Sequence, residues 1–201
     1  MRRILKIGGS MLLRNNLATA VNGWLDRHPA DQTMIIVGGG KLIDAVRELD
    51  RQQPMNPQQV HWMCVDLLTI TAKFAAQHLD CPLITTEADW NTACQERAKT
   101  GNWPSPHWPV TNRPTVIAPA VFYSKRTIIP AIQIPDDWRT TTDSIAGLLA
   151  HIADADELVL LKSCPIAPAM SYLQLAEAGI VDQAFPKVST ILPSVRVEQL
   201  R

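Results

Sequence analysis

Two glycine turns are the parts of this sequence best suited to bind an anion. Each turn follows a short apolar segment, the first after residues 3–7 and the second after residues 34–37. Glycines let the chain turn and leave backbone N–H groups without side-chain cover, as a phosphate site requires. The residues of the two turns are Lys6, Gly8, Gly9, Ser10, Gly38, Gly39 and Gly40. Lys6 adds a positive charge, and Ser10 stands where a helix cap would. Together the two glycine turns therefore predict one shared crevice that binds phosphate.

Two charged residues later in the chain complete this pattern. Asp143 lies at the start of a predicted helix, and Lys162 directly follows the apolar run 158–161. Phosphoryl transfer needs cations and N–H donors around the transferred oxygens, and a carboxylate could orient two lysines there. The alternative for Asp143 is an ordinary aspartate in the first turn of a helix. No P-loop or Gly-x-Gly-x-x-Gly fingerprint is present, so the signal is the combination and its order.

Hydrophobic periodicity predicts how the chain positions these residues. Short apolar runs alternate with segments in which apolar residues recur every three or four positions. The predicted strands are 3–7, 33–37, 82–85 and 158–161, and the predicted helices begin near residues 11, 41, 58, 87, 144 and 166. This alternation predicts an α/β fold, a three-layer αβα sandwich with a mainly parallel central sheet. With 201 residues, we expect one domain spanning 1–201.

Proline marks the irregular parts of the chain. Segments 115–122 and 127–134 are β-rich but interrupted by proline, which predicts edge or hairpin strands. The segment 101–109 contains three prolines and two tryptophans and cannot be regular structure. Either it folds down on the core, or it forms the rigid edge of a substrate pocket. Gly179 is suited to end the last predicted helix, 166–178.

The longest predicted helix, residues 58–79, is apolar on nearly all sides. Such a helix must be covered on both sides. We expect the second cover to be another subunit, which predicts a homodimer through this helix. The alternative is a central core helix in a monomer.

Composition excludes several classes of protein. A net charge of zero and a hydrophobic fraction of 46% indicate a globular protein without general affinity for nucleic acid. The four cysteines, Cys64, Cys81, Cys94 and Cys164, are widely spaced, which predicts reduced thiols and no metal site or disulfide. No signal peptide or membrane-spanning run is evident in the sequence, so we expect a cytoplasmic protein that acts on a small molecule and does not bind membranes.

Four motifs together resemble the amino-acid kinase superfamily, whose fold is shared by acetylglutamate, aspartate and uridylate kinases. They are KIGGS at 6–10, IIVGGG at 35–40, TTDSIA at 141–146 and LVLLKS at 158–163. The runs GGGKLIDAVRELD, HWM and DDWRTTTDSIAGLLA look most like the branch that contains the kinase of methanofuran biosynthesis.

The resemblance implies an ATP-dependent kinase that uses Mg²⁺, and it implies a role for each matching residue. The catalytic residues would be Lys6, Asp143 and Lys162. The nucleotide side would contain Gly8, Gly9, Ser10, Thr142 and Ser163, and the acceptor side Gly38, Gly39, Gly40, Arg47 and His61. Relatives commonly dimerise through the long helix. The chain lacks the Asp-x-Asp-Gly loop of many relatives and is shorter in its nucleotide-binding C-terminal part.

Three functions therefore compete. The first is a kinase that phosphorylates a phosphate-bearing acceptor, with an aminomethylfuran phosphate of one-carbon metabolism as the leading candidate. The second is a ligand-binding or assembly subunit that has lost nucleotide turnover. The third is a kinase for another acceptor, such as a nucleoside monophosphate.

Overall fold

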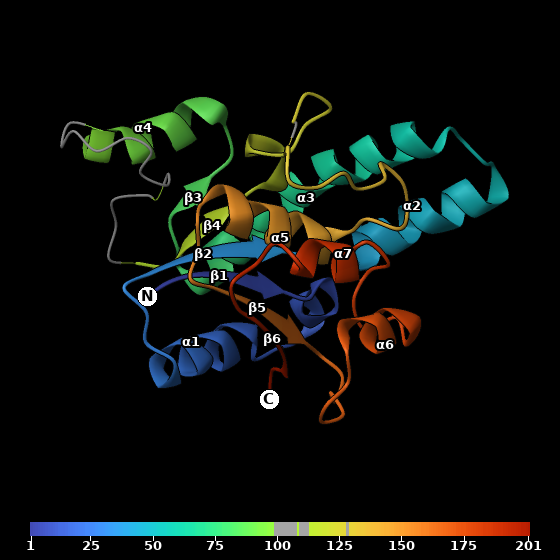
Figure 1. The fold of residues 1–201 in the computed structure, drawn as a ribbon. Coiled ribbons are helices and arrows are strands. Elements are labelled where there is room, and N and C mark those ends of the chain that lie inside the picture. The colour runs from blue at the N-terminus through green and yellow to red at the C-terminus, as the bar shows by residue number, and fades with distance from the viewer. Residues whose placement is uncertain (99–107, 109–112, 128) are drawn as a thin grey trace.

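A parallel β-sheet forms the centre of the molecule (Figure 1). The computed structural model describes residues 1–98, 108, 113–127 and 129–201. Within them the sheet has six strands in the order β3-β4-β2-β1-β5-β6, and every pairing is parallel. The strands are β1 (Arg2–Ile7), β2 (Gln32–Val37), β3 (Leu83–Ile84), β4 (Thr115–Ile117), β5 (Glu157–Lys162) and β6 (Val195–Gln199). The predicted α/β fold with a parallel sheet is confirmed.

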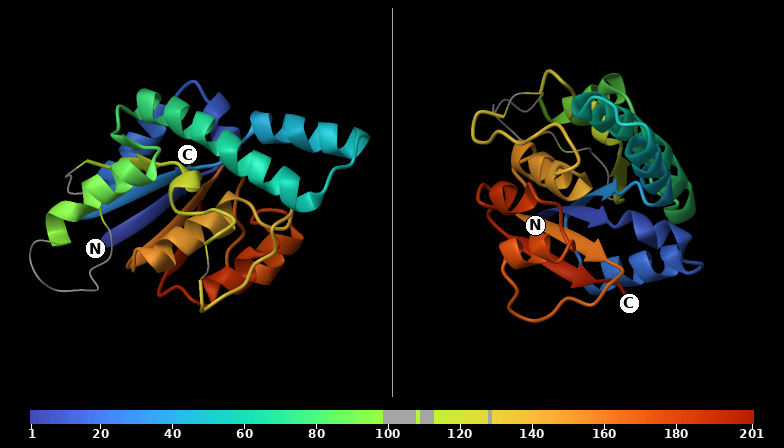
Figure 2. Two further views of the ribbon diagram at one scale, coloured as in Figure 1. Left: turned by 90° about the horizontal axis from the view of Figure 1, so that it is seen from above. Right: turned by 90° about the vertical axis from the view of Figure 1, so that its right-hand side faces the viewer.

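Helices cover both faces of the sheet (Figure 2). On one face α1 (Leu17–Arg27) contacts α3 (Pro57–Leu79), and on the other α5 (Thr142–Ile152) contacts α7 (Phe185–Ser189). The remaining helices are α2 (Lys41–Gln52), α4 (Glu87–Ala98), α6 (Tyr172–Glu177) and the 3₁₀ turns η1 (Gly9–Leu13) and η2 (Pro119–Val121). No helix in these parts of the chain is long and apolar enough to cross a membrane.

The core lies where the three central strands are covered from both sides. In β1, β2 and β5 nearly every residue is buried, and β2 and β5 contain continuous apolar runs, whereas β1 also buries Arg3 and Lys6. The one described residue of the tryptophan-rich segment, Trp108, is also buried, and its indole N–H donates to the Ala153 carbonyl at 2.7 Å. That contact agrees with a segment folded onto the core; the other residues of 101–109 lie outside the described structure.

Several element boundaries differ from those predicted. The helix expected from residue 11 is divided into η1 and α1, because Arg14 is extended and Asn15-Asn16 favours a turn. The predicted edge strand at 115–122 is an inner strand, β4, which lies between β2 and β3 and ends before Pro119. The described part of 127–134 contains no strand, because Pro130 and the turns around it interrupt pairing.

The C-terminal elements were the least predictable. The helix expected over 166–178 is restricted to α6, although Gly179 does follow its end with a left-handed φ of 67°. Both α7 and β6 were missed in the sequence. Each has five residues, too few to give a periodic signal.

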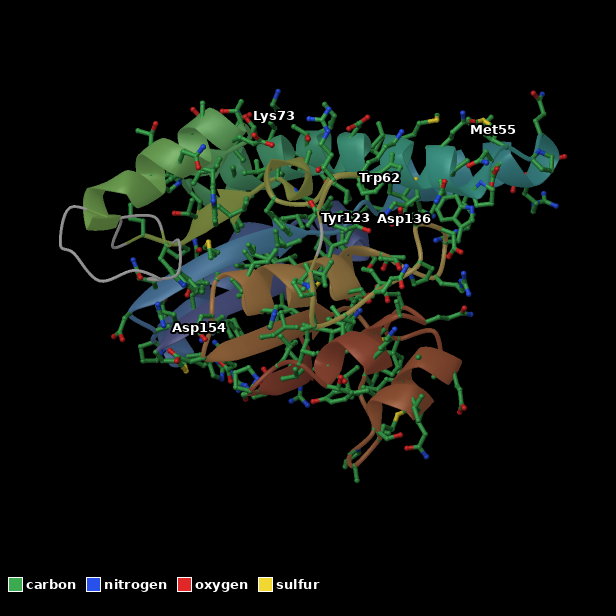
Figure 3. All side chains as sticks on the ribbon, turned by 45° about the horizontal axis from the view of Figure 1, so that its top comes forward. Met55, Trp62, Lys73, Tyr123, Asp136 and Asp154 are labelled. Atoms are coloured by element: carbon green, nitrogen blue, oxygen red, sulfur yellow. The ribbon has the colours of Figure 1, made fainter. Side chains whose placement is uncertain are left out.

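The α2–α3 pair projects from the body of the molecule, with Met55 at its outer turn (Figure 3). No residue of α2 is fully buried. Asn56 caps α3, since its side chain accepts from the backbone N–H groups of Gln58 and Gln59 at 3.0 and 3.3 Å. Helix α2 packs against α3, and its Asp50 carboxylate accepts a hydrogen bond from Trp138.

Candidate active site

The carboxyl ends of β1, β2 and β5 meet at one edge of the sheet. Ile7 is paired with Val37 on one side and with Leu161 on the other. The two glycine turns and Lys162 follow these positions directly, so the topology brings them together. Ligands of open α/β sheets bind at this edge.

A buried carboxylate joins the two lysines there. The Asp143 side chain accepts from Nζ of Lys162 at 2.7 and 2.8 Å, and Nζ of Lys6 lies 2.8 Å from Asp143 Oδ1. All three side chains are at most 10% exposed. Two ammonium groups and one carboxylate give these three side chains one excess positive charge, which the nearby buried Asp182 offsets in part, and each ammonium has three N–H donors. The cluster is suited to hold an additional anion.

The environment changes the titration of two members of the cluster. Burial and then the charge of Lys6 lower the pKa of Lys162 to about 8. Burial opposes ionisation of Asp143, but the two ammonium groups outweigh it and keep the pKa of this carboxyl below its ordinary value. At neutral pH Asp143 is therefore a carboxylate, and Lys162 is mainly an ammonium group.

A second aspartate fixes the helix that carries Asp143. The Asp182 carboxylate accepts from the backbone N–H groups of Thr141 and Ser144, both at 2.9 Å, and from both side-chain hydroxyls. It thus caps α5 from a distant segment, where the Thr141 side chain makes no cap of its own. Burial and the nearby Asp143 raise the pKa of Asp182. No sequence signal near Asp182 indicates this role.

The two glycine turns pack backbone against backbone. A Cβ atom at Gly9 would lie 2.1 Å from the Gly40 nitrogen and 2.7 Å from the Gly38 carbonyl carbon. Gly40 also has a φ of 53°, a left-handed conformation that favours glycine. Glycine is therefore required at Gly9 and Gly40 by contact and by conformation.

This packing decides which N–H groups can meet a ligand. The N–H of Gly8 donates to the Leu161 carbonyl at 3.0 Å, and that of Gly38 donates to the Ile7 carbonyl at 2.9 Å. These two groups serve the sheet. Donors for an anion can come from Gly9 and Ser10 in the first turn of η1, from the N-cap residue Gly40 and from the first turn of α2.

Two hydroxyl groups lie at the outer side of the cluster. The Ser10 and Ser163 oxygens are 2.9 Å apart, and both side chains are exposed. The two residues come from opposite sequence regions, yet they flank the ends of β1 and β5. Their position on the solvent side is compatible with the nucleotide side assigned to them.

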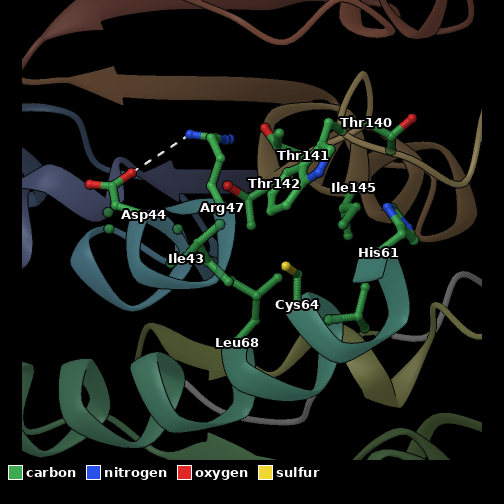
Figure 4. Close-up of a pocket in the computed structure, with 16 residues that line it drawn as sticks. Ile43, Asp44, Arg47, His61, Cys64, Leu68, Thr140, Thr141, Thr142 and Ile145 are labelled. Atoms are coloured by element: carbon green, nitrogen blue, oxygen red, sulfur yellow. Dashed lines mark ion pairs between the residues drawn. The ribbon is translucent and has the colours of Figure 1, made fainter. Parts of the chain in front are cut away.

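A pocket of about 180 Å³ lies on the other side of the glycine turns (Figure 4). It contains all five residues predicted for the acceptor side, together with Gly9 and Thr142 from the nucleotide set. Its lining is Gly9, Gly38, Gly39, Gly40, Ile43, Asp44, Arg47, His61, Cys64, Val65, Leu68, Trp138, Thr140, Thr141, Thr142 and Ile145. One end is formed by backbone and the other by apolar side chains. The Cys64 thiol stays protonated, because burial raises its pKa to about 11.

The two polar side chains predicted for the acceptor side differ in whether they can still hydrogen-bond to a ligand. Arg47 is half exposed, lies 3.6 Å from Asp44 and covers the ring of Trp138. His61 is buried, and its Nδ1 donates to the Asp137 carbonyl at 3.3 Å, so that its Nε2 accepts from Tyr123 at 3.0 Å. Burial also lowers the pKa of His61. A ligand would meet the face of this ring, whereas Arg47 can offer N–H donors.

Sequence reasoning missed the residues that shape this pocket. Trp138, Asp182 and the apolar residues of α3 were not predicted for the site. Trp138 stands in the run DDWRTTTDSIAGLLA, and nothing in that run by itself indicates that this side chain lines a pocket. Trp62, Tyr123 and Asp136 lie close together outside the pocket lining (Figure 3), and the rings of Trp62 and Tyr123 meet the His61 ring edge-on.

Comparison with known proteins identifies the fold. No protein-family model and no curated protein matches the chain. Among solved structures it is similar to UMP kinase from Ureaplasma parvum, with 12% identity and a TM-score of 0.61 over 100% of this chain and 90% of that one. Uridylate kinase from Archaeoglobus fulgidus matches with 16% identity and a TM-score of 0.59 over 98% and 91% of the two chains. Aspartate kinase from Synechocystis matches with 16% identity and a TM-score of 0.57 over 97% of this chain and 38% of that one.

The chain therefore has the amino-acid kinase fold. Identities of 12–16% are too low to carry more than the fold. The function must be argued from the site itself.

Proposed function

We propose that this protein is a small-molecule kinase that transfers the γ-phosphoryl group of ATP to a phosphate-bearing acceptor. The observation that carries the proposal is the buried Lys6–Asp143–Lys162 cluster, which lies beside two glycine turns at the carboxyl edge of the sheet. An excess positive charge in a buried place is costly unless an anion binds to it. A transferring phosphoryl group is such an anion.

In the proposed reaction an oxygen of the acceptor phosphate attacks the γ-phosphorus, and the bond to the bridging oxygen of ADP breaks. Lys6 and Lys162 donate to oxygens on which charge develops, and they are fixed in advance by Asp143. Asp182 fixes α5 and thereby Asp143. The acceptor approaches from the pocket, and the nucleotide from the side of Ser10 and Ser163.

We propose that Mg²⁺ arrives with the nucleotide. The described residues contain no group of three His, Cys, Asp or Glu side chains that could hold a metal. The excess charge of the lysine cluster instead suits the phosphates of a metal–nucleotide complex. When bound, Mg²⁺ would neutralise charge on the β- and γ-phosphates.

An apolar groove offers space for the nucleobase. It begins three residues after Ser163 and is lined mainly by residues 166–172 with Val195 and Val197 of β6. Apolar walls are what a flat base requires. An 8-azido-ATP probe should label the peptide that contains residues 166–172, and excess ATP should prevent the labelling. Labelling confined to other peptides would contradict this placement.

The acceptor pocket supports an acceptor with a phosphate at one end and a small apolar group at the other. Arg47 and the first N–H groups of α2 can hold a phosphate, and Val65, Leu68 and Ile145 can contact an apolar ring. An aminomethylfuran phosphate has the phosphate and a single flat ring, and its charged aminomethyl group would have to lie at the polar edge of the pocket. A nucleoside monophosphate is the second candidate, since UMP kinases have this fold.

The test is ADP release by the purified protein with Mg-ATP and a panel of acceptors: phosphorylated aminomethylfuran, UMP and other phosphate monoesters. Acceptor-dependent turnover is expected, and Lys6→Ala should lower it at least about 10²-fold because a cation that meets the transition state is lost. Lys73→Ala, an exposed lysine on α3, is the control and should leave turnover unchanged. The absence of turnover with every acceptor would contradict the proposal.

Calorimetry separates the kinase from a subunit that has lost turnover. The segment after β5 reads Ser163-Cys164-Pro165 and carries no carboxylate, unlike the loop of many relatives. Binding of Mg-ATP without acceptor-dependent ADP release would favour the non-catalytic subunit.

A further inference from the structure

Trp138 connects the projecting helix α2 to the acceptor pocket. Its indole N–H donates to Asp50 Oδ2 at 2.7 Å, and the other oxygen of Asp50 accepts from the Met55 backbone at 3.0 Å. The orientation of the indole is thus fixed by a carboxylate of another element. The ring is one of the walls of the pocket.

The same ring holds Arg47 in place. Asp50 follows Arg47 by three residues, so both lie on one side of α2. The guanidinium carbon of Arg47 lies 4.7 Å from the centre of the Trp138 ring, a cation–π contact. A half-exposed arginine without such a contact would sample many rotamers and would lose that freedom on binding a ligand. Stacking on Trp138 restricts Arg47 beforehand.

A structural role in the core does not explain Trp138. It is partly exposed and belongs to neither of the two buried hydrophobic clusters. Its contacts are instead to the two charged residues of α2 and to the pocket. An indole at this place therefore serves the pocket.

The size of the pocket limits the molecule that fits. Its volume of about 180 Å³ is small. Pockets for drug-sized ligands usually have about 300–1,000 Å³. Trp138 forms the wall beside Arg47, so a phosphate bound there would bring its organic group against the indole and the apolar residues of α3.

We propose that Trp138, held by Asp50, is a positioning residue that fixes Arg47 for the acceptor, and that the acceptor is a small phosphate monoester with a single flat ring. This inference rests on the proposed function, which makes the pocket the acceptor site. A larger monoester such as UMP fits the pocket less well.

The test measures binding without ATP, so that its failure differs from a failure of phosphoryl transfer. Benzyl phosphate, UMP and benzyl alcohol are titrated into the full chain and followed by calorimetry. Benzyl phosphate should bind at least tenfold more tightly than UMP, and benzyl alcohol should not bind. Equal or tighter binding of UMP would overturn the assigned acceptor class, and no binding by any probe would overturn the proposal as a whole.

Variants then test the positioning role. Trp138→Ala should weaken the binding of benzyl phosphate about tenfold, whereas Trp138→Phe and Asp50→Asn should weaken it less, because each retains part of the arrangement. In an Arg47→Ala background Trp138→Ala should weaken binding by clearly less than tenfold, because only the contact between the indole and the organic group is then lost. A full tenfold loss in that background, or no loss in the single variant, would refute positioning through Arg47.

Two matched controls exclude general damage. Trp62→Phe changes a partly exposed tryptophan of α3 that does not line this pocket. Glu48→Gln changes a carboxylate of α2 whose partners are Arg51 and Gln52. Both should bind benzyl phosphate like the unaltered protein, with unchanged melting temperature.

Discussion

Gly9 and Gly40 contact each other through their backbones, and a Cβ atom at Gly9 would lie 2.1 Å from the Gly40 nitrogen. The turns that follow β1 and β2 are therefore one packed unit. This contact fixes the ends of η1 and α2 relative to each other, and with them the donors that face the proposed phosphate.

Gly9→Ala should separate the two turns, because backbone atoms cannot yield to the added methyl group. We expect a loss of about 2–3 kcal/mol in the free energy of unfolding, at the upper end of overpacking effects, measured by urea denaturation. Gly23→Ala is the control: it lies within α1, where the new methyl group would meet only the end of Arg27 at 3.4 Å. That variant should gain about 0.5–1 kcal/mol. Equal free energies of unfolding for Gly9→Ala and Gly23→Ala would contradict the predicted clash between the two turns.

Asp143→Asn should damage both stability and activity. The substitution leaves two buried ammonium groups without their carboxylate, which typically costs about 3–5 kcal/mol. Urea denaturation at pH 7 measures this loss, and Asp26→Asn, an exposed aspartate of α1, should change stability by less than about 0.5 kcal/mol. Since the pKa of Asp143 is lowered in the folded protein, its contribution is present above its ordinary pKa and is lost in acid.

Lys162 should make the reaction sensitive to alkaline pH. Burial and Lys6 lower its pKa to about 8 from an ordinary value of 10.5. We expect kcat/KM to fall above about pH 8, as the free enzyme loses this charge. Lys162→Arg keeps the charge, so its profile should lack that fall up to pH 10. A fall at the same pH in both proteins would assign it to another group.

The lowered pKa of Lys162 has the opposite effect on stability: kcat/KM should fall with rising pH, whereas the free energy of unfolding should increase. Between pH 8 and 10.5 the unfolded chain holds a proton on Lys162 that the folded protein has lost. Stability therefore rises with pH through this range, as the cost of burying the charge disappears. Urea midpoints of the unaltered protein and Lys162→Met, compared across this range, should converge as the pH increases.

Asp182→Ala should lower activity, although Asp182 does not contact the phosphates in the proposed site. It removes the cap of α5 and leaves the partly buried N–H group of Thr141 and the buried N–H group of Ser144 without their acceptor, at a cost of about 1–3 kcal/mol for unsatisfied groups. We expect lower stability in thermal unfolding together with reduced kcat. Asp182→Asn retains one accepting oxygen and should recover part of both. A stable variant with full kcat would show that α5 needs no such cap.

We propose that α3 forms a homodimer interface. Met63, Ile70 and Phe74 lie along one side of this helix and are 45–52% exposed, although they are large and apolar. Burying such a stripe is favourable. The unaltered protein should sediment as a dimer and Phe74→Glu as a monomer at the same concentration. A monomer in both cases would contradict the interface.

The sequence by itself determined the fold class and the residues capable of chemistry. Apolar runs such as 34–37 are continuous because inner parallel strands are covered on both faces, and this local pattern is visible without coordinates. The glycine turns, Lys6, Asp143 and Lys162 stand at the ends of such elements. Their order along the chain was therefore sufficient to predict that they would meet at one edge of the sheet.

Only the tertiary structure decided how these residues are used. That Asp143 bridges two lysines, that Asp182 caps α5 from about 40 residues away and that Trp138 restrains Arg47 are contacts between distant segments. Short elements such as β6 and α7 also depend on such contacts, since five residues have too little periodicity to specify them. Local sequence records which surfaces a segment can bury, whereas the partners of its polar groups are chosen when the segments pack together.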